Sequence, residues 1–390
     1  MSTVIGTIKE VKNNENRVGL TPQGVQELTK EGHTVFVEKG AGLNIGFGDD
    51  LYESSGAKMV GTPEEVVQAV DILVKVKEPI SDEYKLLDMF KGKTLYTYLH
   101  LSGVDPDLTA KLLENEITSV AYETVEDEKG ELPLLAPMSE VAGVLAVQYG
   151  AQYLQKKYNG IGVTLGNIHG ADPSETVVIG GGFVGATSAR TAVGMGGNVT
   201  IVNRSAERLE RLKSEFRSYL GDKLFSNMSF VEMTDESLRD AVKKADLLVG
   251  AVLVPGARAP EVVSEEMVKS MKNGAVIVDV SIDQGGCIWG SKPTSHSEPI
   301  YEIDGKIFCC ITNMPGQVAR QSTQALTYAT LPYLKKMAKE GVVDYVRSSL
   351  ASDGRFARGI NTYKGKVTYE SVAEDLNLSD QYQQLKDLVA

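Results

Sequence analysis

Cysteine, histidine and tryptophan are scarce in this chain: its 390 residues include three cysteines, four histidines and one tryptophan. The cysteines, Cys287, Cys309 and Cys310, show no spacing typical of metal ligands, and the histidines are scattered along the sequence. We therefore expect no metal site. The cysteines are more typical of small buried side chains in a reducing cytoplasm than of disulfide partners.

Long apolar runs are also lacking. No run approaches the roughly 18 residues of a membrane-spanning helix, and residues 1–16 have no apolar core of the kind found in signal peptides. The formal net charge of −12 disfavours nucleic acid and anionic membranes as main partners. These absences predict a cytoplasmic protein that acts on small molecules. An anionic substrate is not excluded, because a few arginine and lysine side chains can dominate the potential inside a cleft.

A glycine-rich turn is the most informative feature that is present. The stretch TVVIGGGFVG (residues 176–185) leads a β-branched run into a G-x-G-x-x-G turn, and a second apolar run ends at Asn203, 18 residues after the last glycine. Gly180 permits a tight turn, Gly182 lets the backbone approach a pyrophosphate, and Gly185 allows close packing of helix on strand. The helix that follows offers its first N–H groups to phosphates. The stretch predicts a dinucleotide-binding βαβ unit.

Strand and helix patterns alternate on both sides of this turn. Five apolar runs separated by helical patterns precede residue 135, and six predicted strands, counting the one that enters the turn, suit a full doubly wound sheet. A helical pattern from about residue 317 to Lys339 is followed by a polar tail. We predict an α/β fold of two doubly wound domains. Residues 136–317 form a Rossmann dinucleotide-binding domain, inserted into a discontinuous substrate and catalytic domain made of residues 1–135 and 318–390.

Four polar residues fall where strands of such sheets end, namely Arg17, Lys77, His100 and Asp283. The carboxyl ends of the strands are where open α/β sheets bind ligands. Taken singly, each residue is more typical of a solvated charge, a structural histidine or a turn aspartate than of a catalytic group. Spacing alone therefore leaves the assignment open.

Residues 12 to 316 resemble the alanine dehydrogenase branch of the alanine dehydrogenase/transhydrogenase family. The matching stretches are KNNENRVGLTP, GAGLNIGF, LVKVKEP, YLHL, AYETV, LPLLAPMSEVAG, VVIGGGFVG, ADLLVGAVLVPGARAP, VDVSIDQGGC and ITNMPG. The resemblance implies oxidative deamination of L-alanine to pyruvate and ammonium with a nicotinamide cofactor, in a homohexamer. It places substrate binding on Arg17 and Lys77, and catalysis on His100 and Asp283. Guanidinium and ammonium groups suit a carboxylate, and imidazole and carboxylate suit proton transfer.

Further cofactor contacts follow from the same resemblance. Met138 is expected either to border the pocket for the substrate methyl group or to pack in the core. The residues expected to contact the cofactor are Ser139, Gly180, Gly182, Phe183, Val184, Gly185, Asn203, Arg204, Arg208, Val252, Leu253, Asn313 and Met314.

The residue that ends the second strand of the fingerprint departs from the family pattern. Aspartate or glutamate there accepts hydrogen bonds from the ribose hydroxyls of NAD, whereas this chain has Asn203, followed by Arg204 and Arg208. Loss of the carboxylate removes repulsion of a 2′-phosphate, and arginines supply donors for it. The sequence thus favours NADP over NAD. Asparagine can still bind ribose hydroxyls, so NAD or dual use stays open.

Other functions remain as alternatives. A dehydrogenase for another amino acid, or an opine-type reductive condensation, would use Arg17 and Lys77 with a different side-chain pocket. A transhydrogenase-like protein would have lost the catalytic histidine, and His100 is present. A redox sensor would bind the nucleotide without turnover.

Overall fold

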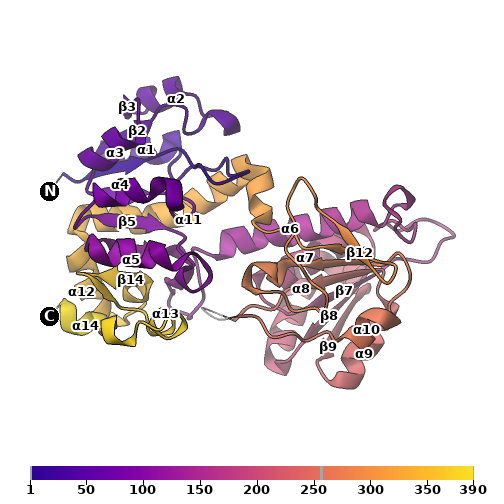
Figure 1. Cartoon of the computed structure of the whole chain (residues 1–390). Helices are drawn as coiled ribbons and strands as arrows, with labels where there is room; N and C mark the ends of the chain where they lie inside the picture. Colours follow the sequence, from indigo (N-terminus) through magenta and orange to yellow (C-terminus); the bar gives the residue numbers. More distant parts are fainter. Residues whose placement is uncertain (1, 255–257, 390) are drawn as a thin grey trace. The chain divides into compact units, whose positions relative to one another are not determined.

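The computed structural model describes residues 2–254 and 258–389. Packing divides the chain into two compact units (Figure 1). The first unit consists of residues 1–138 and 316–390, and the second consists of residues 139–315. Each unit is built around one sheet.

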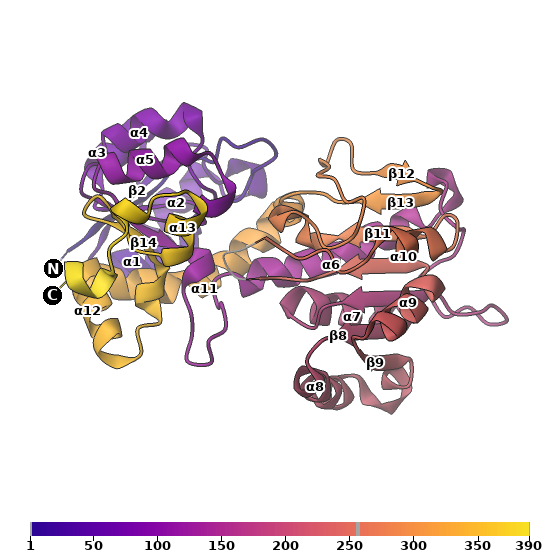
Figure 2. The same cartoon turned by 60° about the horizontal axis from the view of Figure 1, so that its bottom comes forward.

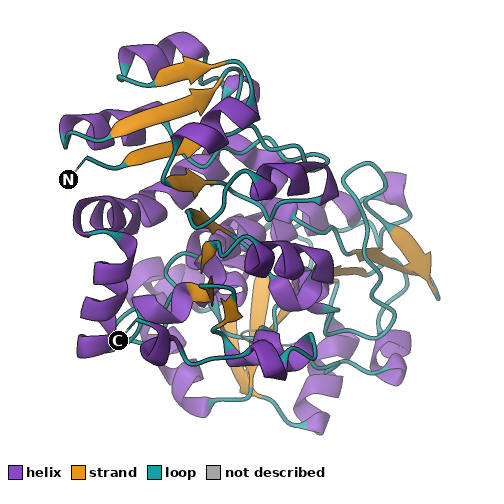
Figure 3. Ribbon diagram, turned by 60° about the vertical axis from the view of Figure 1, so that its left-hand side comes forward, coloured by secondary structure: helices purple, strands orange, loops and turns teal. Residues whose placement is uncertain are grey.

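The sheet of the first unit has eight strands. Six parallel strands lie in the order β3-β2-β1-β4-β5-β6, and the antiparallel strands β14 and β15 extend the β6 edge. The strands are β1 (Val4–Thr7), β2 (Thr34–Glu38), β3 (Lys58–Val60), β4 (Ile72–Val74), β5 (Thr94–Thr97), β6 (Thr118–Ala121), β14 (Ile360–Tyr363) and β15 (Lys366–Val367). Their directions change progressively across the sheet, as expected from strand twist (Figure 3).

Helices cover both faces of this sheet, which is why every residue of β4, β5 and β6 is buried. Figure 2 shows α3 (Pro63–Ala69), α4 (Tyr84–Asp88) and α5 (Pro106–Glu114) on one side, with α1 (Pro22–Lys30) and α12 (Val342–Ser352) on the other. The long helix α11 (Ala319–Glu340) packs against α1 and α12. Thr21 caps α1 as its sequence predicts, with its side chain accepting a hydrogen bond from the N–H of Gly24.

The C-terminal segment is more ordered than the predicted polar tail. After α12 it adds β14 and β15 to the sheet, then the short helices α13 (Glu370–Asp375) and α14 (Leu385–Leu388). Thr362 of β14 is fully buried. Its hydroxyl is satisfied there by hydrogen bonds to the Ser119 hydroxyl at 2.7 Å and to the Ile117 carbonyl at 2.8 Å. Because the buried side chains of this strand include polar ones whose hydrogen bonds are satisfied, the sequence shows no apolar run that would predict a strand here.

The sheet of the second unit has seven strands in the order β9-β8-β7-β10-β11-β13-β12. The six predicted strands are present and parallel, and the antiparallel edge strand β12 adds a seventh. The strands are β7 (Glu175–Ile179), β8 (Asn198–Asn203), β9 (Met228–Glu232), β10 (Leu247–Gly250), β11 (Val276–Asp279), β12 (Tyr301–Ile303) and β13 (Lys306–Cys309).

Two groups of helices accompany this sheet. α7 (Phe183–Met195) contacts α8 (Ala206–Phe225), while α9 (Asp235–Lys244) contacts α10 (Glu265–Ser270). The helix expected from Ser139 begins three residues earlier, as α6 (Ala136–Tyr153). It approaches α7 closely at Gly143, where an added Cβ would lie 2.6 Å from the Val184 carbonyl oxygen.

The parallel strands of both sheets follow one topological order, third-second-first-fourth-fifth-sixth along their own segments. In such sheets ligands bind at the carboxyl ends of the first and fourth strands, where the order reverses. That point lies between β1 and β4 in the first unit and between β7 and β10 in the second. The fold thus provides two positions at which to look for chemistry.

Candidate functional site

Three predicted residues of the first unit follow three neighbouring strands. Arg17 lies in the segment after β1, Lys77 follows β4, and His100 follows β5, and these strands are adjacent in the sheet. The carboxyl ends of parallel strands lie at one edge, so the topology gathers the three residues at the switch point.

Arg17 is almost fully buried, at 2% exposure. Its Nε and Nη2 atoms donate to the two carboxylate oxygens of Glu15 at 2.7 and 2.5 Å, and its Nη1 lies 3.0 Å from the Met138 sulfur. Burial disfavours the charged guanidinium, but the Glu15 carboxylate outweighs it and raises the pKa of Arg17. The guanidinium is therefore a fixed positive charge beside Met138, the residue expected near the substrate methyl group.

The motif LVKVKEP contains two lysines, and the structure separates their environments. Lys75 is buried and lies between two carboxylates, 3.1 Å from Glu10 and 2.7 Å from Glu83. Burial opposes its charge, yet both carboxylates together raise the pKa of Lys75. The Lys77 side chain is 13% exposed and its ammonium lies 3.6 Å from the Glu78 carboxylate. Lys77 is thus the one of these two lysines that a substrate can reach.

Glu78 connects the surroundings of Lys77 and His100. Its carboxylate forms ion pairs with Lys77 and Lys12, and the His100 charge also acts on it. Burial alone would raise the pKa of Glu78, but the two ammonium groups outweigh burial and lower it. The Oε2 atom is buried with no hydrogen-bond partner among the residues described by the structure. Sequence reasoning did not single out this residue.

His100 lies three residues beyond the end of β5, later than the strand-end position expected from its sequence. Its backbone has φ 49° and ψ 39°, a left-handed conformation that residues with a side chain rarely adopt. The imidazole stacks on the Tyr98 ring, with centroids 5.6 Å apart and planes inclined by 3°. The buried Tyr98 also interacts with Arg17, so this ring lies between two predicted site residues.

The main-chain N–H groups of Arg17, Lys77 and His100 each donate a hydrogen bond to a glutamate side chain. Glu15 accepts from Arg17 at 3.0 Å, Glu10 from Lys77 at 3.4 Å and Glu123 from His100 at 2.6 Å. Sequence reasoning missed all three carboxylates. Two of them lie 67 and 23 residues from their partners, so no local spacing could have paired them.

The glycine turn of the second unit has the geometry that its sequence predicts. Gly180 has φ 103°, and a Cβ added at Gly185 would lie 1.9 Å from the Gly180 carbonyl oxygen. A Cβ at Gly182 would meet nothing within 4 Å. Gly182 is also the N-cap of α7, and no side chain caps that helix end. The first N–H groups of α7, from Phe183 and Val184 onward, therefore suit a pyrophosphate approaching past Gly182.

The end of β8 is tied to this turn by side chains. Asn203 accepts from the Gly181 N–H at 3.1 Å through Oδ1 and donates to the Ser205 carbonyl at 3.3 Å through Nδ2. Arg208 donates through Nε to the Gly181 carbonyl at 2.9 Å. Arg204 is exposed and has no hydrogen bond or ion pair within the described part of the chain. The structure thus places Asn203 and Arg208 in contact with the glycine turn, and Arg204 next to Asn203 forms no such contact.

The loops after β10 and β11 are held together by Ser281. Its hydroxyl accepts from the Val252 N–H at 2.9 Å and donates to the Val252 carbonyl at 2.8 Å. Asp279, fully buried, accepts from the Ser281 N–H at 3.0 Å, and burial raises the pKa of this aspartate. Leu253 stays 50% exposed beside these contacts. Asp279 and Ser281 were not predicted from the sequence.

The remaining predicted residues of the second unit follow β11 and β13 or lie in α6. Asp283 is exposed and accepts from the Asn313 N–H at 3.3 Å. Asn313 has φ 52°, while Met314 next to it is buried. Ser139 is partly buried in the first turns of α6. The structure therefore brings Asp283 and Asn313 together, as neighbouring strand ends require.

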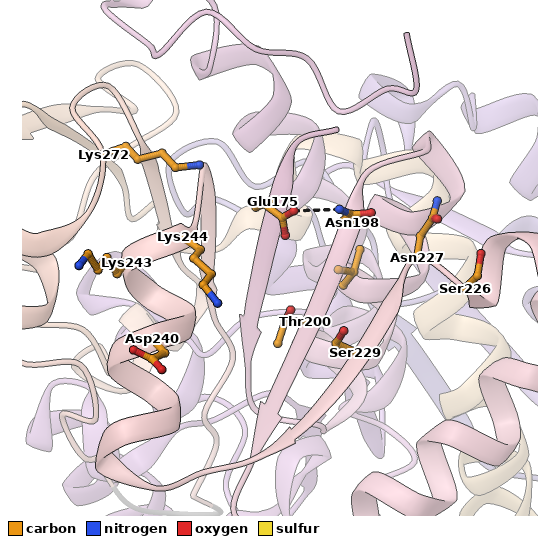
Figure 4. A pocket seen from close by; sticks show the side chains of 11 residues that line it. Glu175, Asn198, Thr200, Ser226, Asn227, Ser229, Asp240, Lys243, Lys244 and Lys272 are labelled. Carbon is orange, nitrogen blue, oxygen red and sulfur yellow. Dashed lines mark hydrogen bonds between the residues drawn. The ribbon is translucent and has the colours of Figure 1, made fainter. Parts of the chain in front are cut away.

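A hollow of about 780 Å³ lies in the second unit at the amino ends of its strands, opposite the glycine turn (Figure 4). It is lined at the amino ends of β7 and β8 by Glu175 and Asn198, which are hydrogen bonded at 2.8 Å, and on α9 by Asp240, Lys243 and Lys244. The lining carries both signs of charge and is far along the strands from the glycine turn. This hollow is not the predicted cofactor position.

The part of the chain that the structure describes lacks a metal-binding cluster and a membrane-spanning helix. Among residues 2–254 and 258–389, no group of three or more histidine, cysteine, aspartate or glutamate side chains could hold a metal ion. No helix within those ranges is both long and apolar enough to cross a membrane.

Two family models match the chain: "Alanine dehydrogenase/PNT, N-terminal domain" over residues 6–142 and "Alanine dehydrogenase/PNT, C-terminal domain" over residues 146–370. An alanine dehydrogenase of Mycolicibacterium smegmatis is 47% identical, with 96% of this chain and 97% of the relative covered. One of Methanococcus maripaludis is 48% identical, with 95% and 96% covered. A solved L-alanine dehydrogenase structure superimposes with a TM-score of 0.87 at 42% identity, covering 96% of this chain and 99% of the other. A transhydrogenase from Sinorhizobium meliloti shares the fold, with a TM-score of 0.77 at 22% identity over 94% and 99% of the two chains.

Proposed function

The chain belongs to the alanine dehydrogenase/PNT family, and from that premise we propose that it is an L-alanine dehydrogenase. The reaction converts L-alanine, water and the oxidised cofactor to pyruvate, ammonium, the reduced cofactor and a proton. The observation that carries the proposal is the gathering of Arg17, Lys77 and His100 at one switch point, in a chain whose near-full-length relatives are alanine dehydrogenases.

Arg17 and Lys77 bind the substrate carboxylate in this proposal. A guanidinium held in one orientation by Glu15 offers planar donors to a carboxylate, and Met138 beside it bounds the space for a small side chain. Lys77 adds a second positive charge and stabilises negative charge that develops on the substrate oxygens. The amino acid is thereby fixed with its Cα hydrogen in a defined direction.

His100 and Asp283 carry the proton transfers. A bound nicotinamide cofactor would supply the acceptor for the hydride that leaves Cα. Water then adds to the resulting imine, and His100 accepts the hydroxyl proton as the carbinolamine releases ammonia. Asp283, exposed next to Asn313, orients water and ammonia. Asn313 and Met314 line the nicotinamide side of the second unit in this assignment.

The described residues fit a dinucleotide. The space at Gly182 and the uncapped start of α7 suit the pyrophosphate. The apolar surface of Val252 and Leu253 and the position of Ser139 in the first turns of α6 are assigned to the nicotinamide half. These residues would hold the cofactor, with Asn203 at its ribose.

We further propose that the chain prefers NADP to NAD. Asn203 presents no carboxylate to repel a 2′-phosphate, and its amide already bonds within the glycine turn. The uncommitted Arg204 supplies a charge-assisted donor at the end of β8. Arg208, which bonds to Gly181 through Nε, supports the turn and keeps a guanidinium nearby.

The double substitution Asn203→Asp with Arg204→Ile tests this preference. Initial rates with each cofactor should show kcat/KM for NADP falling at least about tenfold relative to NAD, since one charge-assisted bond is lost and one repulsion gained. Glu207→Gln in the first turn of α8, exposed and acidic, is a matched control that should leave the ratio unchanged. An unchanged ratio in the double variant would rule out the assignment.

A panel of substrates tests the choice of L-alanine. Rates with glycine, L-serine, L-valine and pyruvate plus a primary amine should all fall well below those with L-alanine or pyruvate plus ammonium. A faster reaction with a larger amino acid would instead support a related dehydrogenase, and product formation from an amine other than ammonia would support the opine-type reaction.

We also propose a homohexamer, which sedimentation velocity would report as about 250 kDa for six copies of the 42.1 kDa chain.

A further inference from the structure

A carboxylate from the neighbouring strand contacts the loop that presents His100. Glu123 lies in the turn Tyr122–Thr124 directly after β6, and β6 pairs in parallel with β5, with Ala121 opposite Thr97. The exits of the two strands therefore lie side by side. Both oxygens of Glu123 accept from the Leu99 N–H at 3.2 Å, and Oε1 also accepts from the His100 N–H at 2.6 Å.

These bonds occur where the main chain is strained. His100 is left-handed, and a residue with a Cβ needs compensating contacts to stay in that conformation. A carboxylate that accepts two consecutive N–H groups supplies them, because hydrogen bonds to a charged acceptor are stronger than those to a neutral one. Glu123 thus fixes the direction in which the imidazole leaves the main chain.

The same carboxylate oxygen faces the imidazole. Nδ1 of His100 lies 3.8 Å from Oε1 of Glu123, within ion-pair distance and longer than a direct hydrogen bond. The ring stacks on Tyr98, whose hydroxyl donates to the Leu134 carbonyl at 2.6 Å. Glu78 is the other carboxylate that interacts with His100. The imidazole itself is 41% exposed, so its orientation depends on these few contacts.

We propose that Glu123 is a positioning residue that holds His100 in its left-handed conformation and keeps the proton of the neutral imidazole on Nδ1. A negative oxygen next to Nδ1 favours the tautomer whose N–H dipole points toward it. Nε2 is then the unprotonated nitrogen. In the proposed reaction Nε2 takes the hydroxyl proton of the carbinolamine in its nitrogen-protonated form, the C=O bond forms, the C–N bond breaks, and its electron pair leaves on neutral ammonia. This inference rests on the proposed function for the role of that proton transfer.

Two variants separate the charge of Glu123 from its hydrogen bonds. Glutamine keeps an oxygen to accept from the Leu99 and His100 N–H groups but loses the charge, whereas alanine loses both. We expect kcat with L-alanine to fall about tenfold in Glu123→Gln and about a hundredfold or more in Glu123→Ala, the range for losing a residue that orients a catalytic group. The KM for the cofactor should stay within about twofold. Glu126→Gln, three residues along and ion-paired with Arg358, is the matched control and should behave as wild type.

The imidazole nitrogens give a readout independent of turnover. In ¹⁵N-labelled full-length protein, the His100 signals are identified by their loss in His100→Gln, and their shifts report which nitrogen carries the proton. The wild type should show the Nδ1–H form and Glu123→Ala a mixture of both forms. Wild-type kcat and wild-type nitrogen shifts in Glu123→Ala would overturn the inference. A wild-type protein that does not oxidise L-alanine would overturn the proposed function instead, while the nitrogen shifts would still decide the role of Glu123.

Discussion

At the scale of single residues, carboxylates determine which cations of the first unit are structural and which can meet a substrate. Lys75 and Lys77 are two residues apart, yet Lys75 is 1% exposed between Glu10 and Glu83, while the Lys77 side chain is 13% exposed and forms an ion pair with Glu78. Removing a buried charge leaves its partners uncompensated. The two lysines should therefore respond differently to the same substitution.

Lys77→Met is expected to raise the KM for L-alanine about tenfold or more, because one charge-assisted contact with the carboxylate is lost. Its free energy of unfolding should stay near wild type. Lys75→Met should instead lower the free energy of unfolding by about 3–5 kcal/mol, since two buried carboxylates lose their counter-ion. Urea denaturation and steady-state kinetics on both variants measure these effects. If Lys75→Met instead raised the KM for L-alanine and left the free energy of unfolding unchanged, Lys75 rather than Lys77 would be the substrate-binding lysine.

Glu10 should make stability depend on pH. Burial, opposed by Lys75, raises the pKa of this carboxyl from its usual 4.5 to about 6. The folded chain then holds the proton more tightly than the unfolded chain, so this contribution to stability is full below pH 4.5 and is lost as the pH rises through about 6. The loss is about 2 kcal/mol, at about 1.4 kcal/mol for each tenfold change in proton affinity.

The measurement is the free energy of unfolding of wild type and Glu10→Gln from pH 4 to 8. Glutamine cannot ionise, so the difference between the two proteins should change across the window from 4.5 to about 6 and be flat above it. A pH-independent change in the free energy of unfolding caused by the substitution itself does not alter how this difference varies with pH. Parallel curves over the whole range would contradict the assignment.

At the scale of secondary-structure elements, the turn from β7 to α7 offers a paired test. An added Cβ at Gly182 meets nothing within 4 Å, whereas one at Gly185 would lie 1.9 Å from the Gly180 carbonyl oxygen. Gly182→Ala should therefore fold normally and bind the cofactor at least about tenfold more weakly, because the methyl group occupies the approach of the pyrophosphate. Gly185→Ala should be strongly destabilised. Thermal unfolding and fluorescence titration with the reduced cofactor distinguish the two, and equal behaviour would contradict this description.

Elements with local signals were predictable from the sequence. The Thr21 cap, the glycine turn and the β-branched strands β7 and β8 each follow from short-range chemistry. The C-terminal strand β14 was missed because its buried polar residues Asn361 and Thr362 pair with Thr124, Ser119 and Ile117, more than 200 residues away. Two of the glutamates that accept from the site residues, Glu10 and Glu123, were missed for a related reason, since strand order rather than sequence spacing brings them to Lys77 and His100.

At the scale of the whole molecule, the chain forms the same strand order twice and places chemistry at the carboxyl ends of both sheets. The residues proposed to act on the substrate, Arg17, Lys77 and His100, follow β1, β4 and β5 of the first, and those proposed to bind the cofactor include residues after β7, β8 and β10 of the second. The discontinuous first unit also explains why its C-terminal strand could be recognised only in three dimensions. Family membership supplies the reaction that this arrangement is proposed to perform.

The most direct test is the initial rate of cofactor reduction with L-alanine at alkaline pH, using NAD and NADP in parallel, for wild type and His100→Ala. The account predicts turnover by the wild type with at least one cofactor and a loss of turnover by about a hundredfold or more in His100→Ala, with the cofactor still bound. Turnover by His100→Ala at the wild-type rate, or none by the wild type with either cofactor, would contradict it.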